Sequence, residues 1–238
     1  MKFRIKAAPL VTVVLLNVGC AGSAPLDVTL YGEEFVESGI PATATADGWA
    51  IAFDAFAVRV AEVRLSGVST QGRTLNLAEP SSGSGQKVAT LQVPEGPIEG
   101  AAFTLEDLFI EGRATNGKLV KTFAWRFEGP VRYANCEVEA TATSDAGGPF
   151  QITIHADHLF HDSLVASAPA IRFGALAAAD TGDGEITREE LSATDIGAYD
   201  SGSQSGIDDL WRFLEAQSKT LGHVNGEGHC EALAVTDR

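Results

Sequence analysis

The stretch NGKLVKTFAWRFE, residues 116–128, decides the fold class of this chain. Its side chains alternate, and Leu119, Phe123, Trp125 and Phe127 fall on one face. A period of two is typical of a half-buried β-strand, because successive side chains of a strand point to opposite faces. The Asn-Gly pair in front of it, between apolar flanks, is a strong signal for a tight hairpin turn. The sequence therefore predicts an antiparallel hairpin at this point.

The same kind of pattern continues on both sides of the hairpin, over residues 26–155, with turn-forming Gly, Pro, Asn and Asp residues between the apolar segments. We expect strands at Leu26–Tyr31, Trp49–Phe53, Phe56–Leu65, Arg73–Leu77, Lys87–Val93, Ala101–Leu105, Lys118–Glu128, Cys136–Ala142 and Phe150–His155. Many short strands with this spacing predict a mainly β fold, specifically an antiparallel β-sandwich over residues 27–160.

The composition changes after this region, and residues 161–238 are expected to form a small helical region. Pro169 suits the first turn of a helix, because its missing N–H needs no partner there. A second helix is expected to begin at Thr187. A third is expected over Gly206–Leu221, with acidic residues in its first turn and Gly222 directly after its end.

The first twenty residues resemble the signal of a bacterial lipoprotein. Basic residues precede a short apolar stretch, Ala7–Leu16, and Val18-Gly19-Cys20 resembles the end of a lipobox, although Asn17 stands where that motif usually has an aliphatic residue. The resemblance implies a signal peptide over residues 1–19, cleaved before Cys20, and lipid on Cys20, which attaches the protein to a membrane. The alternative is an ordinary secretory signal with an incidental cysteine.

The lipobox resemblance also implies a location in the bacterial cell envelope. Ala21 after the cysteine suits an outer-membrane lipoprotein that faces the periplasm or the exterior, and residues 20–26 would form a short tether. No later apolar run has the length of a membrane span, so we expect an anchored and not a spanning protein.

Charge and cysteine content limit the expected partners of the protein and the pairing of its cysteines. The formal net charge is −15, and it becomes −18 once the three bases of the signal are removed, which excludes nucleic acid as an expected partner. The chain has three cysteines. If Cys20 carries lipid, Cys136 and Cys230 remain as an even pair in a compartment that permits disulfides, and we expect them to be bonded to each other.

Residues 180–191, DTGDGEITREEL, resemble the second part of an EF-hand calcium loop. Alignment on Gly184, Ile186 and Glu190 places Asp183 at the fifth position, Glu185 at the seventh, which ligates through its backbone carbonyl, and Glu190 at the twelfth. The resemblance implies that calcium is bound by these three residues.

The first half of this loop departs from the family. Ala179 and Thr181 stand at the first and third positions, so Asp180 serves as the first ligand only if the loop is one residue short. An alternative needs no calcium at all: Thr187 and Glu190 have the spacing of a capping box, in which Glu190 binds backbone donors at a helix start.

Histidine is confined to the last third of the chain, at His155, His158, His161, His223 and His229. Three-residue spacing allows imidazoles to share one helical face, and Asp157 stands among the first three. Nitrogen ligands with a nearby carboxylate suit zinc or copper. Whether the two groups of histidines meet stays open at this point, and the alternative is that they are merely exposed.

Residues 153–158, TIHADH, resemble the His-x-His-x-Asp-His motif of the metallo-β-lactamase superfamily, with Thr153 in place of the first histidine. The resemblance implies a metallohydrolase as one alternative. The sequence favours a lipid-anchored, extracytoplasmic metal-binding module, with calcium as the expected ion and no enzymatic activity. The remaining alternative is a structural or interaction lipoprotein that holds no metal.

Overall fold

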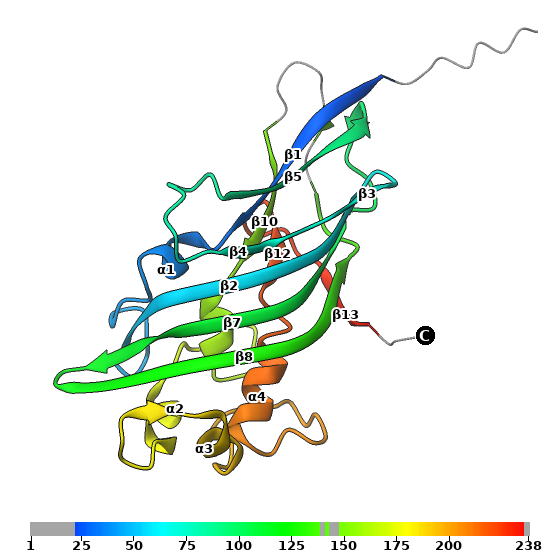
Figure 1. The fold of residues 1–238 in the computed structure, drawn as a ribbon. Helices are drawn as coiled ribbons and strands as arrows, with labels where there is room; N and C mark the ends of the chain where they lie inside the picture. The colour runs from blue at the N-terminus through cyan, green and yellow to red at the C-terminus, as the bar shows by residue number, and fades with distance from the viewer. Residues whose placement is uncertain (1–21, 139–140, 143–147, 236–238) are drawn as a thin grey trace, which may run out of the picture.

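The computed structural model describes residues 22–138, 141–142 and 148–235. It confirms the expected mainly β class, with several mostly antiparallel sheets and few helices (Figure 1). The larger sheet has seven strands: β2 (Ala50–Leu65), β3 (Val68–Gln71), β4 (Thr74–Asn76), β7 (Ala102–Asn116), β8 (Leu119–Ala134), β11 (Glu185–Ile186) and β13 (Glu231–Ala234). Strands β7 and β8 form the hairpin that residues 116–128 predict, and their pairing begins at Asn116 and Leu119.

The second sheet has four strands: β1 (Ser23–Tyr31), β5 (Gln86–Pro94), β10 (Phe150–Ile154) and β12 (Gly222–Val224). A small sheet pairs β6 (Gly96–Pro97) with β9 (Thr141–Ala142). Two pairings are parallel, β1 with β10 and β11 with β8, where only antiparallel neighbours were expected. The strand expected over Cys136–Ala142 is wrong over Cys136–Val138, and within the described residues only Thr141–Ala142 of it is a strand.

The predicted tether is wrong for its last four residues. Ser23–Leu26 belong to β1 and pair with β5, and Leu26 is buried. The reason is the alternation of apolar side chains, which already starts at Ala24. Residues 20 and 21 lie outside the described part of the chain, as does the signal.

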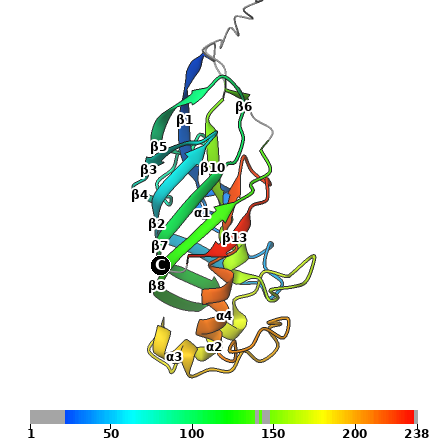
Figure 2. The same ribbon diagram turned by 90° about the vertical axis from the view of Figure 1, so that its right-hand side faces the viewer.

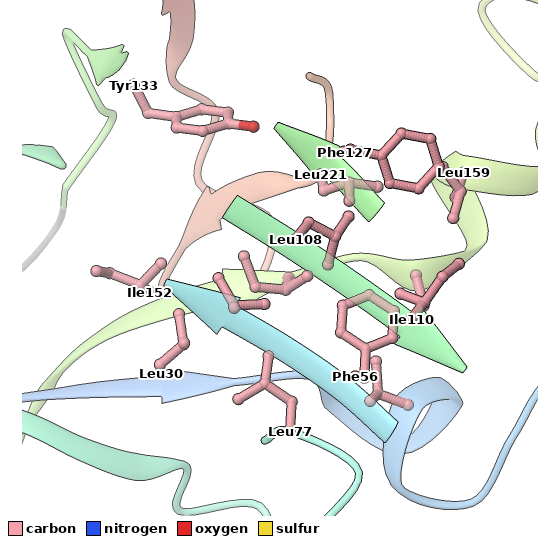
Figure 3. Close-up of a cluster of buried hydrophobic side chains, with 14 of the residues drawn as sticks. Leu30, Phe56, Leu77, Leu108, Ile110, Phe127, Tyr133, Ile152, Leu159 and Leu221 are labelled. Carbon is pink, nitrogen blue, oxygen red and sulfur yellow. The ribbon is translucent and has the colours of Figure 1, made fainter. Parts of the chain in front are cut away.

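The hydrophobic core lies between the two sheets. Leu30 of β1 and Ile152 of β10 face Phe56 of β2 and Ile110 of β7, and all four are fully buried (Figure 3). Burial of each such side chain contributes about 1.5–3 kcal/mol to the free energy of unfolding. This core fixes the position of β10, at whose end His155 begins the candidate site.

Five short helices complete the fold: α1 (Glu33–Glu37), the 3-10 helix η1 (Ala156–Phe160), α2 (Gly174–Ala179), α3 (Arg188–Ser192) and α4 (Leu210–Gln217). Helices α2, α3 and α4 gather at one end of the two sheets (Figures 1 and 2). The helix expected from Pro169 starts only at Gly174, because Ala170 and Arg172 donate their N–H groups to Asp162 and Phe160 instead.

The second helix begins after Thr187 as predicted. The third is shorter than predicted at both ends. Asp209 caps it by accepting a hydrogen bond from the Arg212 N–H, so the helix starts at Leu210 and ends at Gln217. A cap inside the predicted span sets a later start than the apolar pattern alone suggests.

The expected division into a sandwich (27–160) and a separate helical region (161–238) is wrong. Strands β11 and β13 add to β8, and β12 adds to β10, so the C-terminal third completes both sheets. The Cys136–Cys230 disulfide, predicted from the cysteine count, joins these parts covalently. The fold is therefore continuous from β1 to β13.

Candidate metal centre

All five histidines of the chain lie in one cluster. The ring centroids of His155 and His223 are 4.3 Å apart, and those of His155 and His158 are 5.2 Å apart. His161 follows at 4.7 Å from His158, and His229 at 5.1 Å from His223. The two histidine groups of the sequence therefore meet, which the sequence left open.

Local structure explains the first group. His155 caps the N-terminus of η1, and His161 caps its C-terminus, with His158 between them. In a 3-10 helix, side chains three residues apart eclipse one another, so the three-residue spacing places the three rings on one face. Asp157 lies on the same turn, where its Oδ2 is 3.4 Å from Nε2 of His161.

Sheet pairing brings in the second group. Strand β12 runs antiparallel to β10, and His223 pairs with Thr153, two residues before His155. A tight turn follows, closed by reciprocal backbone hydrogen bonds of 2.9 Å between Val224 and Gly228, and it returns the chain so that His229 lies beside His223.

A hydrogen bond determines which ring nitrogen of His158 carries the hydrogen, whereas His223 has a nitrogen without such a bond to any described residue. Nδ1 of His158 is 2.9 Å from the carbonyl oxygen of Thr220. Because a carbonyl only accepts, this nitrogen carries the hydrogen and Nε2 keeps its lone pair for a ligand. Nδ1 of His223 is buried and has no hydrogen-bond partner in the part of the chain that the structure describes.

Three carboxylates surround the imidazoles. Ligand atoms of His155, Asp157 and His158 all lie within 4.8 Å of one another, and the same holds for His155 with Glu33 and Glu227. Oε2 of Glu33 is 3.5 Å from Nδ1 of His155. Sequence reasoning missed both glutamates. Glu227 lies within the second histidine segment and was the one that spacing could have found, whereas nothing near Glu33 in the sequence points to the cluster.

The environment sets protonation states that suit a metal. Burial, together with the charges of His155 and His158, lowers the pKa of His223 to about 3. Burial also lowers the pKa of His158. Burial acts to raise the pKa of Asp157, but its hydrogen bond with His161 and the nearby imidazoles bring that pKa below its ordinary value. Near neutral pH His158 and His223 are therefore neutral and Asp157 is charged, the forms that ligate metals.

A pH dependence of stability follows from His223. Its pKa is about 3 in the folded chain and near 6.5 when unfolded, so the unfolded chain binds more protons between these values. In metal-free buffer, the contribution of neutral His223 is complete above pH 6.5 and is lost as the pH falls toward 3, with a slope of up to about 1.4 kcal/mol per pH unit. Urea unfolding at pH 7, 6, 5 and 4 measures this slope. The slope should be shallower in His223→Asn, and an equal slope in that variant would contradict the assignment.

Thr153 stands at the position of the first histidine in the metallo-β-lactamase motif, and its side chain is engaged in a hydrogen bond. The hydroxyl oxygen of Thr153 accepts a hydrogen bond of 3.0 Å from the N–H of Gly226, and the Thr153 side chain is buried. It therefore positions the turn of the second histidine segment. The hydrolase alternative stays a prediction from the sequence alone.

The calcium-loop residues form a second, separate group. Carboxylate oxygens of Asp180, Asp183 and Glu190 lie within 4.8 Å of one another. Glu190 forms the capping box that the alternative predicts: its Oε2 accepts from the Thr187 N–H at 2.9 Å, and its Oε1 accepts from both the N–H and the hydroxyl of Thr181 at 2.7 Å. These hydrogen bonds, those with Thr181 foremost, lower the pKa of Glu190 to about 2.

A lysine that sequence reasoning missed reaches into this loop. Nζ of Lys121, on β8, forms an ion pair with Oδ2 of Asp180, while Oδ1 accepts from the N–H groups of Gly182 and Gly184. The Lys121 ammonium, first among these partners, holds the pKa of Asp180 far below its usual range. Glu185 lies in β11, opposite Thr122 of β8, so the loop is docked on the large sheet beside Lys121.

No family model, curated protein or solved structure matches the chain.

Proposed function

We propose that the protein binds a transition-metal ion, zinc or copper, at the histidine cluster. The observation that carries this proposal is the buried, unpaired Nδ1 of His223 beside three other imidazole rings. Buried polar atoms nearly always have a partner, so a buried imidazole nitrogen that is paired with no described residue is available to a ligand. Imidazole nitrogens with a carboxylate are the ligands that zinc and copper prefer over calcium or magnesium.

The residues divide into an inner group and a rim. His155, His158 and Asp157 supply the inner ligands, since their ligand atoms lie within 4.8 Å of one another. His223, whose ring centroid is 4.3 Å from that of His155, adds a further nitrogen ligand. The Thr220 carbonyl orients His158 from behind, as outer-shell acceptors do for metal-bound histidines. His161 lies at the rim on one side and His229 on the other, where His229 is exposed to solvent.

Metal stoichiometry tests the proposal directly. The purified chain is stripped with a chelator, reloaded separately with zinc, copper(II) and calcium, and weighed by native mass spectrometry. We expect one zinc or copper ion per chain, retained after buffer exchange. Retention of neither ion would overturn the proposal and leave a structural or interaction protein without metal at this site.

Calcium at residues 180–190 is a second candidate, favoured by the three carboxylates that converge there. Because the Lys121 ammonium already neutralises Asp180, we expect weak binding in the parent chain, in the roughly 10⁻⁴–10⁻³ M range of extracellular modules. Lys121→Gln should raise calcium affinity at least about tenfold, since it removes a competing cation. Asp183→Asn should lower it. Calorimetric titration measures both, and a parent and Lys121→Gln chain that are both indifferent to calcium would leave the loop a structural cap.

We also propose that the metal site is displayed outside the cytoplasm by lipid on Cys20. The support is the lipobox resemblance of residues 18–20 and the disulfide, which forms in oxidising compartments. Among the residues that the structure describes, none of the helices has the length and apolar character needed to cross a membrane.

Expression in bacteria that process lipoproteins tests the anchor. The parent chain should take up labelled acyl groups and remain with the membrane fraction. Cys20→Ala should take up no label and leave that fraction, because the acceptor thiol is lost. Equal labelling of the Cys20→Ala chain would refute the assignment.

A further inference from the structure

A pocket with a volume of about 250 Å³ opens between strands β7 and β8 and the segment that follows α4. It shares no residue with the histidine cluster or with the calcium loop. Figure 3 shows four of its lining side chains, Leu108 of β7, Phe127 and Tyr133 of β8, and Leu221. For comparison, an apolar cavity of about 150 Å³ in another protein stays dry and binds benzene, so this pocket has room for a small ligand.

The pocket exists because the β7–β8 ladder is irregular there. Asp107 pairs with Glu128, but the next pair is Leu105 with Val131, so Glu106 faces the two residues Gly129 and Pro130. Gly129 adopts a φ of +111°, which an L side chain rarely adopts. Such bulges bend the strand and re-aim side chains, and they are common beside binding sites.

About half of the pocket lining is apolar. Leu108, Phe127, Tyr133 and Leu221 are buried and form its walls together with half-buried Val131. The Tyr133 hydroxyl donates a hydrogen bond of 3.1 Å to the carbonyl oxygen of Lys219, so its polar end is already satisfied, and Phe103 stacks on its ring at 4.7 Å and holds it in place as a wall. These walls suit an aliphatic or aromatic body.

The polar lining is mainly acidic. Asp107, Glu128 and Glu215 line the pocket, against the single base Lys219. Oδ2 of Asp107 is paired with Arg126, and Oδ1 is buried, with no hydrogen-bond partner among the described residues. The carboxylates of Glu128 and Glu215 carry no such pair inside the pocket lining, so a positively charged ligand group fits this lining and the net charge of −15.

We propose that this pocket binds a small cationic amphiphile, an apolar body of about six to ten carbon atoms that ends in a protonated amine. The body lies against Leu108, Phe127 and Tyr133, and the ammonium group lies among the carboxylates of Asp107, Glu128 and Glu215. Specificity then comes from charge at one end of an apolar pocket, the usual arrangement of small-molecule sites.

n-Octylammonium is the probe that tests this assignment, with n-octanol and n-octanoate as matched neutral and anionic compounds. Titration of the full chain at pH 7, followed by calorimetry and by nuclear magnetic resonance shifts, should show octylammonium binding at least tenfold more tightly than octanol, and octanoate most weakly. Shifts should concentrate on residues 105–108, 127–133 and 218–221.

Two variants separate the charge from the pocket. Asp107→Asn should weaken octylammonium at least tenfold and leave octanol unchanged, whereas Val131→Trp should weaken both by filling the space. Glu111→Gln, which removes an exposed acid of β7 outside the pocket, is the control and should leave all three affinities unchanged. For Asp107→Asn, a loss of folding would appear as a loss of octanol binding as well, whereas the folded variant keeps it.

Three results would overturn the proposal. If octanol or octanoate binds the parent chain as tightly as octylammonium, the pocket does not recognise the ammonium charge. If the shifts spread over the surface, the ligand does not bind in this pocket. If no probe binds at millimolar concentration, the proposed ligand class is wrong.

Discussion

Replacing His158 by Gln is expected to lower the zinc affinity of the chain by at least about 100-fold. Loss of outer-shell partners alone typically costs 10–100-fold in metal affinity, and His158 is placed as an inner ligand with its Nε2 lone pair free. Gln keeps a donor that can reach the Thr220 carbonyl, and His158 is only partly buried, so the fold should persist. Calorimetric titration against a competing chelator measures the affinity.

A stability measurement gives an independent reading of the same change. Zinc at 100 times its dissociation constant should stabilise the parent chain by about 2.7 kcal/mol, because the ion binds only the folded state. At that zinc concentration the His158→Gln chain should gain almost nothing. Its melting temperature without zinc should stay near that of the parent.

Two further variants serve as controls for His158→Gln. His229→Gln changes an exposed ring at the rim and should weaken zinc less than His158→Gln does. Asp183→Asn lies in the separate calcium loop and should leave zinc binding unchanged. Zinc affinity that is equal in the parent and the His158→Gln chain would contradict the proposed ligand set.

Removal of the disulfide by Cys136→Ser with Cys230→Ser should lower the free energy of unfolding by about 4–5 kcal/mol. The bond closes a loop with a sequence separation of 94 residues, and the chain-entropy model gives this value as an upper figure for such a loop. Denaturant unfolding of the double variant against the parent, without reductant, measures the difference.

The same double variant should also bind zinc more weakly. Cys230 follows His229 directly, and the Glu137 N–H donates a hydrogen bond of 2.8 Å to the His229 carbonyl, so the bridge holds this histidine beside the cluster. The expected loss resembles that of His229→Gln and is smaller than that of His158→Gln. A double variant with parental stability would show that non-covalent contacts alone hold β13.

Sequence reasoning succeeded where the physics is local. The alternation of Phe123, Trp125 and Phe127 depends only on strand geometry, and all three side chains are buried together. Leu119 was expected on the same face, but it lies at the hairpin end and is largely exposed. The capping box at Thr187 also succeeded, because its hydrogen bonds span three residues.

Sequence reasoning failed where partners are far apart in the chain. Pro169 is compatible with a helix, but hydrogen bonds to Asp162 and to the Phe160 carbonyl hold the backbone around it in another conformation. The pairing of Lys121 with Asp180 depends on β11 docking beside β8, and no local pattern encodes that contact.

The candidate metal site contains both local features, which the sequence predicted, and contacts between distant residues, which it did not. Three histidines with three-residue spacing, together with Asp157, are recognisable locally. Their meeting with His223 requires the β10–β12 pairing, and the approach of Glu33 requires β1 to lie beside β10. Sheet order carries this information, and spacing along the chain does not.

If Cys20 carries lipid, as we propose, strand β1 separates the proposed metal site from that lipid. It spans nine residues from Ser23 to Tyr31, and Glu33 at its far end approaches His155. At about 3.3 Å per residue the strand is roughly 30 Å long. Because β1 pairs with β5 on one side and with β10 on the other, it is a rigid spacer. With lipid on Cys20 and β1 perpendicular to the membrane, the histidines would lie several times the roughly 8 Å screening length of physiological salt above the headgroups. The site would then draw its ion from the surrounding fluid and not from the ions concentrated at the bilayer.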